Sequence, residues 1–386
     1  MKNPINVHDK LHLVALTAVL CLLVGSLVPP IMSGRQRPLA DDVDMELTTE
    51  PTQGYLFRSS MLLQGKVPKQ HQDNPECQSN DNPLWCYIES GWVKQTSAAT
   101  TSPTAEDSVV SSDTIQKFTF SDSPVCEVTQ HVDLNRESTF PAVNDEMWMN
   151  IAIPGLQRSL SSDDLERDGI DFFFPPTTEQ RSYEYYDPFL SESRPIDFKE
   201  KKMIDGQPIY VYYQRLRGEP LQKLAEASAS LSTYGLAEEE IPTDADELPG
   251  MSLEGDAFRF YTDDELKARK LKRNDTVFMD PYYSMERTVY VEPNTGVIVN
   301  KEETGGVYYA RNREEAQQLA DEPASPRRSL YTGTFNWDGK TQAAAMDVAR
   351  PTILTLRVSN IIGWVGKVAG VALLLWAAVL YSRRRA

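Results

Sequence analysis

The chain has 386 residues, which is enough for one large domain or two modest ones. It carries 56 acidic and 39 basic residues and a formal net charge of −17, so it lacks the basic surface that nucleic-acid binding requires. The same acidity would repel anionic lipid head groups, and any membrane attachment must therefore come from apolar segments.

The first predicted element is an apolar helix over residues 11–32, a stretch without Asp, Glu, Lys or Arg. It is long enough to cross a hydrocarbon core of about 30 Å. A cleaved signal peptide opens in the same way, but its apolar stretch is usually shorter and ends in small residues. Here Pro29, Pro30 and Met32 follow instead. We therefore expect an uncleaved transmembrane helix, preceded by a short cytoplasmic segment over residues 1–10.

The cysteines of the predicted extracytoplasmic domain, residues 33–350, are Cys77, Cys86 and Cys126. Three thiols in an oxidising compartment leave at least one unpaired. The segment between Cys77 and Cys86 is short, polar and rich in turn-forming residues, so it permits a Cys77–Cys86 disulfide, while pairing through Cys126 is the open alternative. No Cys-x-x-Cys occurs and the histidines are scattered, so we expect no metal site.

A Ser- and Thr-rich stretch over residues 96–113 offers almost nothing to bury. Such a composition predicts a mobile, solvated loop, with O-glycosylation as the less favoured alternative. We predict one domain over residues 33–350. The alternative is two subdomains with a break near residues 136–155.

Strand signals dominate the rest of this domain. The strongest is residues 208–216, where aromatic and β-branched residues follow the turn pair Asp205-Gly206. A hairpin is predicted over residues 287–303, because a proline followed by Gly296 can close its turn. Shorter strands are predicted at 117–120, 125–132, 148–153, 181–186 and 306–310. The predicted fold class is α+β: a β-rich extracytoplasmic domain, mostly antiparallel sheet, flanked by one transmembrane α-helix at each end.

Helices are subordinate in this domain. They are predicted over 221–232, over 262–269 behind the capping pair Thr262 and Glu265, and over 313–320. The acidic stretch 237–254 predicts a surface excursion. Its side chains Asp244, Asp246 and Glu247 lack the glycine and terminal glutamate of an EF-hand loop, which argues against a calcium site.

The last predicted element, residues 351–381, comprises a juxtamembrane segment and a second transmembrane helix, and a basic tail over 382–386 follows it. Three arginines in this tail place it in the cytoplasm by the positive-inside rule, so both termini are predicted inside. Lys367 interrupts the apolar span. Its side chain can extend to the head groups, which is the simpler interpretation, or it can contact a partner helix in the membrane.

No catalytic motif is present, and we assign no catalytic residue and no cofactor. The feature above background is aromatic density, and Tyr183, Tyr185, Tyr210 and Tyr212 are weak candidates for ligand binding. Strand alternation would point Tyr210 and Tyr212 outward while Ile209, Val211 and Tyr213 face the core. Core packing is the favoured interpretation of the aromatic clusters, and an exposed aromatic surface for a sugar or acyl chain is the alternative.

These segments carry a family resemblance. A Tyr-rich strand ending in Tyr-Asp-Pro, an Asp-Gly turn before a second Tyr strand, and the hairpin RTVYVEPNTGVIVNKEE occur in order, before a terminal helix after FNWDGKTQAAAMDVA. The chain from Gly155 onward resembles the porin-A-like family of two-helix actinobacterial envelope proteins. The resemblance implies an inner-membrane protein associated with assembly of lipoglycans such as lipomannan, and it brings no catalytic residues.

The favoured function is therefore a non-catalytic envelope protein that is anchored in the lipid bilayer. Its outer domain would bind a glycolipid, a lipoglycan precursor or a biosynthetic partner such as a membrane glycosyltransferase. One alternative is a pore former, although the charge-capped terminal helix and short strands argue against a transmembrane barrel. The other alternative is a glycan-active enzyme, which would need two carboxylates about 5–10 Å apart in a pocket.

Overall fold

The computed structural model describes residues 7–36, 39–79, 81–142, 147–153, 158–162, 167–221, 230–233, 252–322, 325 and 327–385. The chain forms two compact units. We call residues 1–38 and 346–386 the helix unit, and residues 39–345 the sheet unit. The predicted calcium candidates Asp244, Asp246 and Glu247, and nearly all of the acidic stretch around them, lie outside the described residues.

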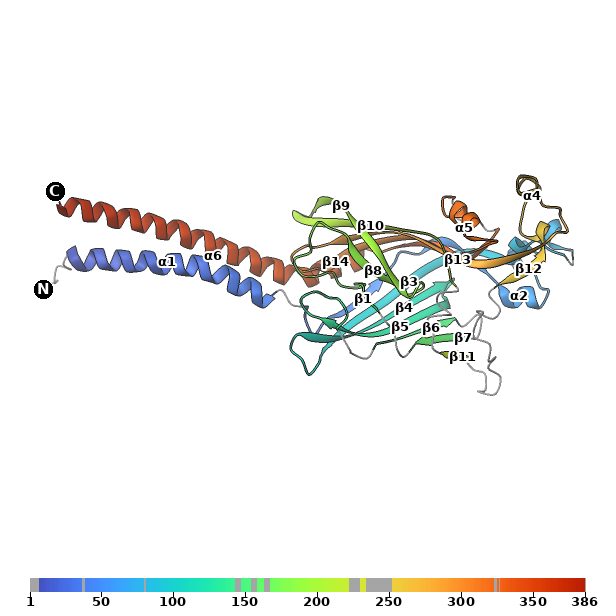
Figure 1. Ribbon diagram of the computed structural model, residues 1–386, viewed down its shortest axis with the longest axis horizontal. Helices are drawn as coiled ribbons and strands as arrows, with labels where there is room; N and C mark the ends of the chain where they lie inside the picture. Colours follow the sequence, from blue (N-terminus) through green and yellow to red (C-terminus); the bar gives the residue numbers. More distant parts are fainter. Residues whose placement is uncertain are drawn as a thin grey trace. The chain divides into compact units, whose positions relative to one another are not determined.

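The helix unit consists of α1 (Val7–Gln36) and the greater part of α6 (Gly339–Arg385), which run side by side (Figure 1). Glycines form the contact between them. A Cβ atom on Gly25 would lie 2.8 Å from the carbonyl oxygen of Gly363, and one on Gly366 would lie 2.9 Å from that of Cys21. The two backbones approach this closely because no side chains separate them, which is the usual packing of helices in membranes.

Both helices are long and apolar enough to cross a membrane, but the second differs from its prediction. The helix extends further than predicted, because α6 begins at Gly339, before the predicted juxtamembrane segment, and has 47 residues. Asp338 caps its start, with Oδ1 accepting a hydrogen bond from the Thr341 backbone N–H at 2.7 Å. Ala343, Ala344 and Ala345 then favour helix, and Pro351 lies inside it without ending it.

The sheet unit contains a 15-stranded sheet, and every ladder between its named strands is antiparallel. Its strands are β1 (Asp44–Thr48), β2 (Thr52–Phe57), β3 (Ile88–Pro103), β4 (Val109–Phe120), β5 (Ser123–Asn135), β6 (Trp148–Ile153), β7 (Arg158–Ser162), β8 (Tyr183–Asp187), β9 (Glu192–Ile204), β10 (Gln207–Pro220), β11 (Ser230–Thr233), β12 (Leu253–Asp256), β13 (Thr276–Val291), β14 (Ile298–Ala310) and β15 (Ser329–Asn336). The mostly antiparallel, β-rich character that the sequence predicts is confirmed.

The path through the sheet is β11-β7-β6-β5-β4-β3-β2-β15-β14-β13-β10-β9-β8, with β1 added on β3 and β12 on β13. Strands β3 to β7 are neighbours in chain order and lie side by side in Figure 1. The second half of the path joins the first where Tyr331 on β15 pairs with Leu56 on β2. Strand β6 lies within the residues of the predicted subdomain break, 136–155, and pairs with β5 in this same sheet.

Short helices decorate the sheet: α2 (Ser59–Leu63), α4 (Asp263–Arg269) and α5 (Arg313–Leu319), with 3-10 turns η1 (Lys69–His71), η2 (Pro75–Cys77), η3 (Leu84–Tyr87) and η6 (Ala257–Arg259). The helices predicted at 262–269 and 313–320 are confirmed, and the capping box between Thr262 and Glu265 is present. Residues 222–229 of the helix predicted at 221–232 lie outside the described residues, and its end is wrong because residues 230–233 pair with β7 as strand β11.

The prediction of a mobile loop over residues 96–113 is also wrong. This stretch forms the end of β3 and the start of β4, with Thr101 opposite Ser112. Its small hydroxyl side chains fit a pleated surface, and their backbone groups are satisfied by the ladder. The apolar Ala99 and Val110 are buried there, and Ser112 is only 1% exposed. This polar stretch therefore forms a β-hairpin, although its composition is typical of a loop.

Candidate functional site

The interior of the sheet unit contains a cluster of ion pairs. Arg287 on β13 donates from Nη2 to Oδ2 of Asp187 on β8 at 2.6 Å, and both side chains are buried. The Arg287 Nε also lies 3.1 Å from Oε1 of Glu303 on β14, and Glu303 in turn pairs with Lys301 at 2.9 Å. The Tyr283 hydroxyl donates to Asp187 at 3.1 Å. Strands β13 and β14 are neighbours, whereas β10 and β9 separate β13 from β8 in the sheet, so the cluster joins both neighbouring and distant strands.

A second buried pair joins this cluster electrostatically. Arg167 and Asp171 lie 3.9 Å apart, and Arg167 stacks over the Tyr186 ring. Burial raises the pKa of Asp171 despite the nearby Arg167, Lys301 and Arg287 cations. Burial acts in the same direction on Glu303, but the Lys301 ammonium and the Arg287 guanidinium outweigh it and hold the pKa of Glu303 below its usual value.

The cluster has the chemistry of a structural element. Its three carboxylates, on Asp171, Asp187 and Glu303, face an equal number of cations, so the buried charge is balanced. Asp187 and Glu303 are both paired with Arg287, which leaves neither as a free acid or base. Buried pairs of this kind stabilise a geometry only while both partners are present. We assign them to the fold.

The four tyrosines considered for ligand binding lie mostly in the core. Tyr183, Tyr185 and Tyr212 are buried, and only Tyr210 is partly exposed. Phe174 packs on Tyr212 with ring centroids 4.8 Å apart. The prediction that Tyr212 faces outward is wrong, because the β9–β10 register shifts between Val211 and Tyr212 and because both sides of β10 are covered there.

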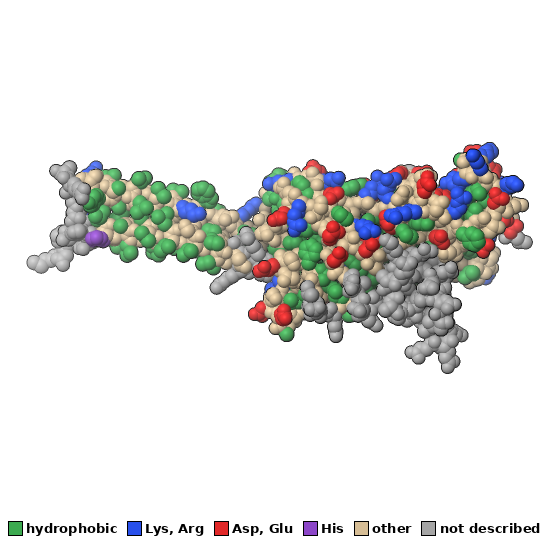
Figure 2. Space-filling view, in the orientation of Figure 1, with side chains coloured by type: hydrophobic (Ala, Val, Ile, Leu, Met, Phe, Trp, Pro, Cys, Tyr) green, Lys and Arg blue, Asp and Glu red, His purple; other side chains and the backbone are tan. Residues whose placement is uncertain are grey.

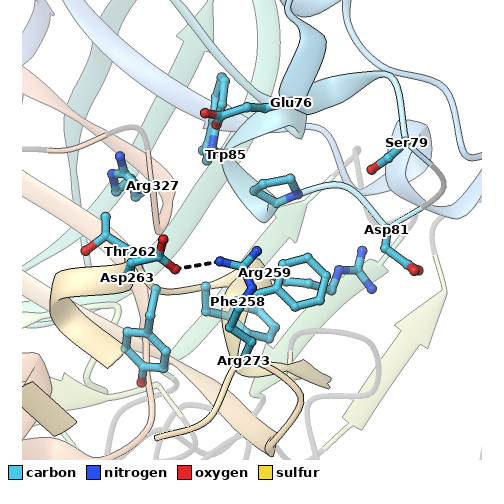
Figure 3. Close-up of a pocket in the computed structure, with 13 residues that line it drawn as sticks. Glu76, Ser79, Asp81, Trp85, Phe258, Arg259, Thr262, Asp263, Arg273 and Arg327 are labelled. Atoms are coloured by element: carbon cyan, nitrogen blue, oxygen red, sulfur yellow. Dashed lines mark hydrogen bonds and ion pairs between the residues drawn. The ribbon is translucent and has the colours of Figure 1, made fainter. Parts of the chain in front are cut away.

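A cavity of about 410 Å³ lies elsewhere in the sheet unit (Figure 3). One wall is the segment around the Cys77–Cys86 disulfide, whose Cα atoms lie 5.6 Å apart, and it contributes Trp85. The opposite wall is η6 with the start of α4. The Arg259 Nε donates to the Asn82 carbonyl oxygen at 3.1 Å and so connects the two walls.

The cavity carries both charge signs. Asp263 and Arg273 pair at 2.5 Å, as the dashed line in Figure 3 marks, and Arg273 stacks over Phe258. Within the described part of the chain, the side chains of Glu76, Asp81 and Arg327 make no hydrogen bond or ion pair, although all three line the cavity. This site cannot be predicted from the sequence, because its residues come from three distant segments and no local spacing links them.

Comparison with known proteins identifies the family. A family profile described as Porin PorA matches residues 12–379. The chain belongs to the PorA porin family. A protein named Porin PorA from Corynebacterium resistens is 27% identical over 94% of each chain. Another of the same name, from Corynebacterium amycolatum, is 24% identical over 93% of this chain and 95% of that protein.

This family membership confirms the resemblance seen in the sequence and corrects the function drawn from it. The favoured interpretation, a non-catalytic factor that binds a glycolipid and supports lipoglycan assembly, is wrong, because the relatives of this PorA family member are named porins. The predicted glycolipid and glycosyltransferase partners have no support for the same reason. The pore-forming alternative agrees better with the family.

Two further predicted residues have definite places in this PorA family member. Lys367 lies on α6 in the helix unit with an exposed side chain, which leaves both head-group and partner contacts open. Cys126 is a free, buried thiol on β5. Its burial, together with the smaller effect of the nearby Glu127 carboxylate, raises the pKa of this thiol to about 12. No group of three or more potential metal ligands occurs among the described residues.

Proposed function

We propose that this chain is a pore-forming protein of a cell-envelope membrane. The observation that carries the proposal is the extent of the family match, because residues 12–379 include nearly all of both apolar helices and the whole sheet unit. A match confined to the sheet unit would say nothing about membrane insertion. Here the two apolar helices, which are able to enter a bilayer, lie almost entirely within the residues that the family profile matches.

The surface of the helix unit supports a place in the bilayer. Large apolar side chains point away from the helix pair; Leu16 is 69% exposed and Trp364 is 72% exposed. Figure 2 shows hydrophobic side chains over most of the visible face of these helices. In water such a surface would associate or aggregate, whereas lipid solvates it at no cost.

The glycine contact adds a condition to the proposal. Because Gly25 and Gly366 bring the two backbones together, one helix pair encloses no water path of its own. Conduction through these helices would therefore require several copies arranged around a common axis. The finer topology that we propose has both termini in the cytoplasm and the sheet unit outside an inner membrane, supported by the arginines at 383–385.

Planar-bilayer recording of the purified full-length protein tests this function. We expect stepwise increases in conductance after addition of protein, and none after addition of an equal amount of detergent or of heat-unfolded protein. Repeated recordings without conductance steps, from protein shown to be folded by its far-ultraviolet circular dichroism, would remove the proposal.

A further inference from the structure

We infer that the cavity between the Cys77–Cys86 segment and residues 257–263 binds a small zwitterionic solute, an amino acid or a short peptide. This inference goes beyond pore formation, because it assigns a binding site and a ligand class within the sheet unit. It rests on three properties of the cavity: its size and fixed walls, its unpaired charges and its aromatic surface.

The size and the walls suit a small ligand. A volume of about 410 Å³ falls within the range of roughly 300–1,000 Å³ that is usual for ligand pockets. The disulfide fixes one wall, the capping box at Thr262 fixes the other, and the hydrogen bond from Arg259 to Asn82 joins them. Such a site is formed before the ligand arrives, which lowers the entropy cost of binding.

The unpaired charges select the ligand class. Glu76 and Asp81 offer carboxylates, while Arg327 and the free nitrogens of the Arg259 guanidinium offer donors, and in Figure 3 Arg327 and Asp81 lie on opposite sides of the pocket. A solute with an ammonium and a carboxylate can satisfy both signs, and guanidinium groups bind carboxylates in bidentate geometry. Glu76, Asp81 and Arg327 are all exposed to water, so a neutral sugar would gain nothing from their charges, and an anion would be repelled by Glu76 and Asp81.

The aromatic surface indicates an apolar side chain on that solute. Trp85 and Phe258 both line the cavity, and each is held in place by a neighbour. The His71 ring contacts the Trp85 ring edge-on at 5.3 Å, and Arg273 lies over Phe258. Rings fixed in this way offer broad apolar area next to the charged groups. A dipeptide with leucine side chains combines both features.

Isothermal titration calorimetry of the full-length protein in detergent, with Leu-Leu as the probe, tests the inference. We expect saturable binding of Leu-Leu. N-acetyl-Leu-Leu lacks the ammonium and Leu-Leu amide lacks the carboxylate. We expect the affinity of each to be lower than that of Leu-Leu by about tenfold or more. The inference would be overturned if Leu-Leu showed no saturable binding. It would also be overturned if the two capped peptides bound as tightly as Leu-Leu, or if maltose bound more tightly than Leu-Leu.

Variants locate the site. We expect Arg327→Gln to weaken Leu-Leu binding about tenfold and to leave the affinity for Leu-Leu amide, which has no carboxylate, unchanged. We expect Glu76→Gln to weaken Leu-Leu binding about tenfold and to leave the affinity for N-acetyl-Leu-Leu, which has no ammonium, unchanged. Arg181→Gln and Glu200→Gln are matched controls, because both side chains are exposed and lie outside the cavity. If the controls weaken binding equally, the site is elsewhere. The titration uses no bilayer, so its result is independent of whether the protein conducts.

Discussion

The helix unit and the sheet unit distribute polarity in opposite ways. In the helix unit the contact is made by glycines and the large apolar side chains, such as Leu16 and Trp364, point outward. In the sheet unit aromatic side chains and ion pairs are inside, and Figure 2 shows Lys, Arg, Asp and Glu over the visible surface. The difference indicates two solvents, lipid for one unit and water for the other.

The two units are also held together by different forces. Lipid tails are as apolar as leucine, so burial provides no net driving force between α1 and α6, and close backbone packing replaces it. In the sheet unit, burial of residues such as Tyr212 and Phe335 provides the main favourable term. Substitutions should therefore act on one unit at a time, and by different mechanisms.

The largest expected effect is in the buried ion cluster. Arg287→Met removes the cation between Asp187 and Glu303, which leaves the buried Asp187 without a cation and Glu303 with Lys301 alone. We expect the free energy of unfolding of the sheet unit to fall by about 3–5 kcal/mol. Guanidinium chloride titration followed by near-ultraviolet circular dichroism measures this change.

Lys367→Met is the matched control for Arg287→Met. Lys367 has an exposed side chain in the helix unit, so its loss should leave the unfolding of the sheet unit unchanged. If both variants lower the stability of the sheet unit equally, the contrast between a buried, paired charge and an exposed one does not hold.

The disulfide should have the next largest effect. The Cys86→Ser variant opens the bridge to Cys77, which lies 9 residues away. A loop of this length stabilises the folded state by about 2–3 kcal/mol in the chain-entropy description. We expect that loss in the chemical unfolding of the sheet unit, and weaker binding of the Leu-Leu probe. Unchanged stability would show that the packing of Leu84 and Tyr87 already fixes this segment.

The smallest expected effect is at the helix contact. In Gly366→Ala the new Cβ would lie 2.8 Å from the Cα of Gly25, so the helices must separate slightly. We expect a loss of about 1–2 kcal/mol in the helix unit, measured by tryptophan fluorescence during titration with sodium dodecyl sulfate. Gly34→Ala is the control, because nothing lies within 4 Å of a Cβ at Gly34. Equal effects of the two variants would argue against the glycine contact.

Features that depend on a few adjacent residues could be predicted from the sequence. The Thr262 capping box needs only the residue three positions later, and the turn before Gly296 needs only a positive φ, which is +73° in the structure. The strand at Trp148–Ile153 was predicted with its observed bounds. In each case the local chemistry favours the conformation that the fold uses.

Features that depend on partners distant in the chain could not. The hydroxyl-rich strands β3 and β4 look like a loop until each supplies the other's hydrogen bonds. Tyr212 looks half exposed until Phe174, from a separate segment, covers it. The cavity needs Trp85, Arg259 and Arg327 together, and nothing in their spacing along the chain brings them into one site.

The sequence by itself determined the two apolar helices, the antiparallel character of the sheet domain and the family, because length, hydropathy and turn residues are local properties. Tertiary structure decided which elements pack together and which side chains are buried or paired. It paired α1 with α6 through glycines, placed Arg287 and Asp187 in the interior, and left Glu76 and Arg327 unpaired at a cavity. Contact, burial and charge pairing depend on distances in space, and residues far apart in the chain set those distances.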